Sequence, residues 1–128
     1  MKILFRVLSG LVGLMMLVNG VRFLIDPAGA AAGLGMELLT GVGASTQVGD
    51  ISAFFVSIAI FVALAQRAGA SRWLVAAAVP LAAAAIMRTL TAATGTAPFA
   101  AQFIVPEVVM ATILLTAARL RRDEPAAR

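Results

Sequence analysis

The sequence predicts an all-α membrane protein in which four transmembrane helices form an antiparallel bundle. Of its 128 residues, 62% are apolar and 12% are charged, whereas a soluble domain has about 45–50% apolar and about 25% charged residues. The mean hydropathy is +1.02. Four apolar runs reach the ~20 residues that a helix needs to cross a hydrocarbon core about 30 Å thick. Basic residues stand at the ends of these runs, which is typical of membrane orientation.

The predicted helices cover about residues 2–25, 47–66, 72–93 and 100–120, within one domain, 1–122, that a tail, 123–128, follows. Each run must be helical, because lipid offers no partner for unpaired backbone groups. The connection from Asp26 to Thr46 is long, and we expect a short helix in it, around Ala30–Leu39, that lies at the interface or re-enters the membrane. The short connections at 67–71 and 95–98 predict tight antiparallel hairpins.

The distribution of basic residues predicts that both termini are cytoplasmic. Arg22 and Arg88 lie toward the outer side. The other eight basic residues lie on the inner side, and they are Lys2, Arg6, Arg67, Arg72, Arg119, Arg121, Arg122 and Arg128. The segment Arg119–Arg128 is interpreted as a topology anchor. Lys2 and Arg6 before an apolar run also imitate a cleaved signal peptide, but the run continues to Ile25 and favours a retained helix.

The missing residue types exclude several classes of function. The chain has no cysteine and no histidine, so thiolate, disulfide, histidine-ligated metal and Ser-His-Asp chemistry are excluded. Met15 and Met16 are interpreted as packing residues and not as copper ligands, since no third thioether is spaced to complete a site. The placement of the basic residues argues against nucleic acid as a partner. We therefore expect no catalytic group, no metal and no cofactor, which favours a protein that is not an enzyme.

Four charged residues define the candidate site. Arg22, Asp50, Arg88 and Glu107 lie about 24, 25, 24 and 18 Å from the inner basic anchors of their helices, at 1.5 Å per residue. One charge from each helix thus falls in one layer in the outer half of the bundle, with Asn19 and Gln47 beside it. Charges at this depth are functional candidates by default. The competing interpretations are structural ion pairs, Arg22 with Asp50 and Arg88 with Glu107, or snorkelling to the interface.

A family resemblance rests on the layout of several short segments. They are the Pro27 loop with Leu34-Gly35, Gly49-Asp50, Phe54-Phe55, Trp73-Leu74, Ile86-Met87-Arg88 and Glu107. With this layout over nearly its whole length, the chain resembles a family of small four-helix bacterial membrane proteins of unknown function that are similar to the DoxX-like proteins. The resemblance implies an inner-membrane location. It also suggests a quinone ligand or a membrane oxidoreductase as partner, since DoxX-like proteins are associated with such enzymes.

Three functions follow as hypotheses. The preferred one is a binding or accessory subunit whose charged layer holds a lipid, a quinone or a partner helix, with Arg22 and Arg88 anchoring an anionic or carbonyl group. The alternative is a small proton-coupled transporter that uses Glu107 or Asp50. A third is an enzyme in which these two carboxylates act on a lipid head group as acid and base. Small residues along the helices fit either intramolecular packing or a homodimer.

Overall fold

The computed structural model describes residues 1–67, 69–122 and 124, which form five α-helices. In chain order these are α1 (Lys2–Ile25), α2 (Pro27–Gly33), α3 (Gly41–Ala65), α4 (Arg72–Ala93) and α5 (Ala101–Leu120). Four of them, α1, α3, α4 and α5, are long and apolar enough to cross a membrane. The predicted fold class, an all-α bundle with four candidate spans, is therefore confirmed.

The connection between α1 and α3 differs from the prediction in two ways. The short helix α2 begins at Pro27, directly after α1, where the Asp26 carboxylate accepts a hydrogen bond from the backbone N–H of Gly29 at 3.0 Å. This is a side-chain cap with proline at the first helical position, an arrangement that starts helices well. Helix α3 begins at Gly41 and not at about 47. Residues 41–46 are small and weakly apolar, so they extend the helix without extending the apolar run.

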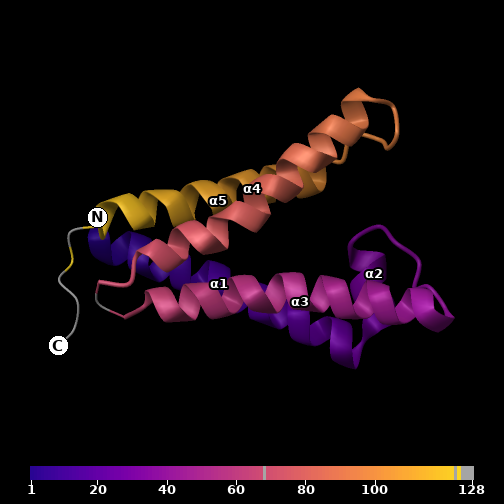
Figure 1. Ribbon diagram of the computed structural model, residues 1–128, viewed down its shortest axis with the longest axis horizontal. Helices are drawn as coiled ribbons and strands as arrows, with labels where there is room; N and C mark the ends of the chain where they lie inside the picture. Colours follow the sequence, from indigo (N-terminus) through magenta and orange to yellow (C-terminus); the bar gives the residue numbers. More distant parts are fainter. Residues whose placement is uncertain (68, 123, 125–128) are drawn as a thin grey trace.

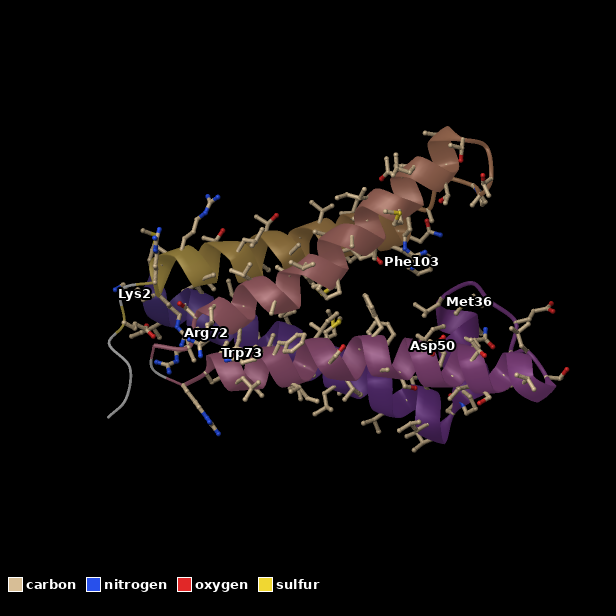
Figure 2. All side chains as sticks on the ribbon, viewed as in Figure 1. Lys2, Met36, Asp50, Arg72, Trp73 and Phe103 are labelled. Atoms are coloured by element: carbon tan, nitrogen blue, oxygen red, sulfur yellow. The ribbon has the colours of Figure 1, made fainter. Side chains whose placement is uncertain are left out.

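The long helices associate as two pairs. Helix α1 packs most extensively against α3, and α4 packs most extensively against α5. Contacts between α3 and α4 and between α1 and α5 join the pairs. The pairs lie together at the end that holds the N-terminus and the α3–α4 connection, and they separate toward the end that holds α2 and the α4–α5 connection (Figure 1). Lys2, Arg72 and Trp73 mark the joined end, whereas Met36, Asp50 and Phe103 lie toward the splayed end (Figure 2).

Small residues allow the helices to approach closely. At Gly13 on α1, a Cβ atom would lie only 2.6 Å from Cγ1 of Val62 on α3, and at Gly20 it would lie 2.7 Å from Cγ2 of Val56. The core between the pairs is also rich in alanine, including the fully buried Ala77. Many larger apolar side chains point outward instead, as expected for helices that face lipid. Small residues at helix contacts are typical of packing within membranes, where close van der Waals contact holds helices together.

Two arginines close the joined end around the C-terminus of α3. The Arg121 side chain, just after α5, is completely buried, and its Nη2 donates to the backbone oxygen of Ala65 at 2.7 Å. Arg6 on α1 donates to the backbone oxygen of Gln66. The last carbonyls of a helix have no hydrogen-bond donor within the helix and carry partial negative charge. A guanidinium group supplies both hydrogen-bond donors and positive charge. Arg121, predicted as part of a topology anchor, thus also ties α5 to α3.

Candidate ligand-binding site

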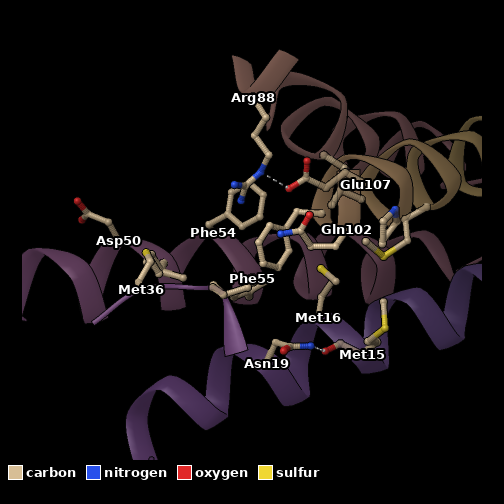
Figure 3. Close-up of a pocket in the computed structure, with 16 residues that line it drawn as sticks. Met15, Met16, Asn19, Met36, Asp50, Phe54, Phe55, Arg88, Gln102 and Glu107 are labelled. Carbon is tan, nitrogen blue, oxygen red and sulfur yellow. Dashed lines mark hydrogen bonds and ion pairs between the residues drawn. The ribbon is translucent and has the colours of Figure 1, made fainter. Parts of the chain in front are cut away.

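A cavity of about 490 Å³ lies between the two helix pairs, in the half of the molecule where they separate. Every long helix and the loop after α2 contribute to its wall, for example Met16 from α1, Met36 from the loop, Phe54 from α3, Arg88 from α4 and Glu107 from α5 (Figure 3). Ligand pockets in proteins are about 300–1,000 Å³ and mostly apolar, with a few placed polar groups. The cavity therefore has the size of a small-molecule site.

The apolar part of the wall is made largely of methionine and phenylalanine. Four of the six methionines line the cavity, namely Met15, Met16, Met36 and Met110. Phe54, Phe55 and Phe103 line it too. Sequence analysis found only the Met15–Met16 pair, because the other two methionines stand far away along the chain. Met36 lies apart from Met15 and Met16 (Figure 3), so the four thioethers form a flexible apolar wall.

The polar part of the wall includes an ion pair that joins α4 to α5. Arg88 Nε donates to Glu107 Oε1 at 3.1 Å. The Arg88 guanidinium also lies over the ring of Phe103, 5.1 Å from its centre. Glu107 is only 8% exposed, and its Oε2 is buried with no hydrogen-bond partner among the described residues. The predicted pairing of Arg88 with Glu107 is confirmed.

The other predicted pairing is wrong, because Arg22 does not reach Asp50. Arg22 Nη2 lies 3.8 Å from Asp26 Oδ2, its neighbour one turn further along the chain, and it is not part of the cavity wall. Asp50 lines the cavity and forms no ion pair with any described residue. Helical depth alone suggested that Arg22 and Asp50 meet. The immediate turn from α1 into α2 brings Asp26 back to Arg22 instead.

Asn19 and Gln47 have different roles from each other. Asn19 lines the cavity, and its Nδ2 donates to the backbone oxygen of Met15 at 2.8 Å. Gln47 is not part of the wall. Its Nε2 donates to the backbone oxygen of Glu37 at 3.0 Å, and its Oε1 accepts from the backbone N–H of Leu39 at 2.9 Å. Gln47 therefore holds the loop that brings Met36 to the cavity.

The first turns of α5 add wall residues that were not among the predicted site residues. Gln102 and Pro106 both line the cavity. Proline has no N–H, so the carbonyl of Gln102, four residues earlier, has no helical donor. The signal for this feature in the sequence is a proline inside an apolar run, which marks a place where a helix leaves a backbone acceptor free.

Together these features define a small multi-pass membrane protein with four candidate spans and a cavity between two helix pairs. Comparisons with protein-family models, with curated proteins and with solved structures found no match to the chain. No family is therefore identified for the chain.

Proposed function

We propose that the protein is a membrane-embedded binding or accessory subunit that holds a small amphipathic molecule in the cavity between its helix pairs. Lipids and quinones are the candidates by chemistry. The observation that carries the proposal is the composition of the wall, in which flexible apolar side chains surround a few polar groups, among them the Arg88–Glu107 ion pair. An amphipathic molecule places its chain or ring against the methionines and phenylalanines, and its polar group beside Arg88.

Arg88 is the polar anchor in this proposal. Its Nε is engaged by Glu107, whereas its two Nη groups form no hydrogen bond or ion pair with any described residue. Glu107 and the ring of Phe103 hold the guanidinium in place. The Nη groups can then donate to a carbonyl or phosphate oxygen of the ligand. Such a bond is stronger in a low-dielectric cavity than in water.

Native mass spectrometry of the protein in mild detergent tests this proposal. The unmodified chain is expected to carry a discrete added mass, and Arg88→Ala is expected to lose it. Arg22→Ala is the matched control, because it removes an arginine from the same end of the molecule but outside the cavity. We expect this control to retain the added mass.

Two other outcomes would replace the proposal. If neither the unmodified chain nor the control carries any added mass, the ion pair is structural. The cavity is then filled only by lipid or detergent molecules that are not retained. If the bound molecule crosses proteoliposome membranes in a pH-dependent manner that Glu107→Gln abolishes, the protein is a proton-coupled transporter. The burial of Glu107 favours that second candidate, since it places one carboxylate between the helix pairs.

We infer that the protein lies in the bacterial inner membrane with both termini cytoplasmic and the cavity in the outer half. Basic residues, Lys2 and Arg72 among them, gather at the joined end (Figure 2), and positive charge is typical of cytoplasmic loops. The chain has no cysteine, so single cysteines can report its orientation. The Glu37→Cys variant is expected to react with an impermeant maleimide on intact spheroplasts, whereas the Arg122→Cys variant is expected to react only after lysis. The reverse pattern would invert the proposed orientation.

We also propose two partners. The resemblance of the sequence to the DoxX-like proteins suggests a membrane oxidoreductase, and the small residues along the helices would allow a second copy of the chain to pack. Both would appear in the same mass spectra as an added protein mass. A quinone ligand would fit the first of these partners, since quinones exchange electrons with membrane oxidoreductases.

A further inference from the structure

We propose that the cavity selects a ligand whose polar group is uncharged and offers a carbonyl oxygen, and that Gln102 recognises this group together with Arg88. The inference rests on the proposed function and narrows its ligand class. Of the two oxygen acceptors that Arg88 can anchor, it assigns the carbonyl and rejects the phosphate. Two observations carry it, the way in which the charge of Arg88 is compensated and the position of the Gln102 amide.

The charge of Arg88 is already neutralised by Glu107. Arg88 Nε lies 3.1 Å from Glu107 Oε1, and Arg88 is the only basic residue among the described residues that line the cavity. Glu107 Oε2 is buried and has no partner among the described residues, so no second cation shares this carboxylate. A bound phosphate or carboxylate would therefore bring a negative charge next to Glu107 with no cation left to balance it. Burying an uncompensated charge is costly, whereas an uncharged acceptor leaves the pair neutral.

The third ionic side chain of the wall does not change this balance in favour of an anion. Asp50 is exposed, and its carboxylate points away from the other lining side chains (Figure 3). Water solvates it there, and it can only add negative charge to the surroundings of the cavity. The groups that remain to bind the ligand are thus hydrogen-bond donors and acceptors without net charge.

Gln102 supplies the second of these groups. It lies in the first turn of α5, and its amide points into the cavity on the side of the Arg88–Glu107 pair (Figure 3). The side chain is exposed and forms no hydrogen bond with any described residue, so a ligand can reach it. A glutamine amide offers two N–H donors and one acceptor but no charge. Together with the Nη groups of Arg88 it can hold an uncharged, oxygen-bearing group from two sides.

The apolar wall suits a ligand with a flat ring beside this polar group. Phe54 and Phe55 line the cavity as an edge-to-face pair with ring centres 5.4 Å apart. Methionine sulfur makes favourable contacts with aromatic rings, and its flexible side chain adapts to their shape. Aromatic carbonyl compounds are therefore the appropriate probes for the cavity.

The test uses two pairs of matched aromatic probes. Anthraquinone-2-sulfonamide and anthraquinone-2-sulfonate have nearly the same size but differ in charge, whereas anthraquinone and anthracene have the same ring shape with and without carbonyls. Equilibrium dialysis against the protein in a nonionic detergent measures binding, with partition into empty micelles as background. Relative to this background, we expect the sulfonamide to bind about tenfold more tightly than the sulfonate. Anthraquinone is expected to bind about tenfold more tightly than anthracene.

The variant Gln102→Leu tests the second donor. Its loss is expected to weaken anthraquinone binding about fivefold and to leave anthracene binding within twofold, because only the carbonyl compound uses the amide. Gln66→Leu is the matched control, since it makes the same substitution outside the cavity, and it should leave the binding of both probes within twofold. Size-exclusion chromatography checks that both variants fold. A loss of equal size for anthraquinone and anthracene in Gln102→Leu would mean that Gln102 only shapes the wall, and would overturn its role.

The failure of this inference differs from the failure of the proposed function. If the sulfonate binds as tightly as the sulfonamide, or anthracene as tightly as anthraquinone, the cavity binds amphipathic molecules without selecting an uncharged carbonyl, and the inference is wrong. It is also wrong if no probe binds above the micelle background while native spectra still show an added mass. If no probe binds and the spectra show no added mass, the proposed function fails too.

Discussion

Replacing Arg121 with methionine is expected to lower the free energy of unfolding by about 3 kcal/mol. The guanidinium is fully buried, donates to the backbone oxygen of Ala65 at 2.7 Å and lies 3.2 Å from Glu124 Oε2. Methionine has a similar length but no donor, so the substitution leaves a helix-end carbonyl and a carboxylate without their partner. Equilibrium unfolding in mixed micelles with increasing sodium dodecyl sulfate measures the change.

Arg122→Met is the control for this prediction. Arg122 is the next residue, carries the same charge and is exposed. Its replacement is expected to change the unfolding free energy by no more than about 0.5 kcal/mol. Equal losses in the two variants would mean that the charge at this end stabilises the protein and that the buried hydrogen bonds do not.

Replacing both members of the Arg88–Glu107 pair with apolar residues is expected to separate stability from binding. Glu107→Leu alone leaves the guanidinium without its carboxylate at membrane depth, and we expect it to lower the unfolding free energy by about 2 kcal/mol. Arg88 is 39% exposed in its side chain, which is why this value lies below those of fully buried pairs. Adding Arg88→Met is expected to restore most of the lost stability, because a well-packed apolar pair can replace a buried ion pair without loss.

Ligand retention is expected to behave differently from stability in this series. Both variants lack part of the polar anchor, so both should lose the added mass in native spectra, although the double variant is nearly as stable as the unmodified chain. The single variant Arg88→Met completes the comparison. If the double variant loses as much unfolding free energy as Glu107→Leu and Arg88→Met lose together, the two side chains are not energetically coupled. A stable double variant that keeps its ligand would show that the polar group of the ligand lies elsewhere.

The four spans could be predicted because the physical constraint behind them is simple. An apolar run of about 20 residues in lipid must be helical, so α1 and α4 have the predicted boundaries, 2–25 and 72–93. The start of α3 could not be predicted in this way. Gly41–Thr46 contains no strong apolar run, and its helical structure follows from its continuity with the span after it. Composition locates the part of a helix that lies in lipid, not the turns that extend beyond it.

The sequence predicted how deep the site residues lie along their helices, but it did not predict the direction in which the Arg22 side chain points. Depth along each helix placed Asp50, Arg88 and Glu107 in one layer, and all three line the cavity. Depth does not tell which way a side chain points when two helices twist around each other. Arg22 therefore turned out to lie outside the cavity with Asp26. The convergence of Met36 and Met110 depends on the tertiary packing of a loop and α5, which no local pattern records.

The separation of the two helix pairs has a consequence for the membrane itself. The pairs are joined at one end and apart at the other (Figure 1), so the molecule is wedge-shaped along the direction of its spans. It occupies a larger area in the leaflet at its splayed end than in the opposite leaflet. Lipids must tilt or spread to follow this taper, and a bilayer that bulges toward the splayed end accommodates it with less distortion. We therefore expect the protein to favour membranes that curve in this direction.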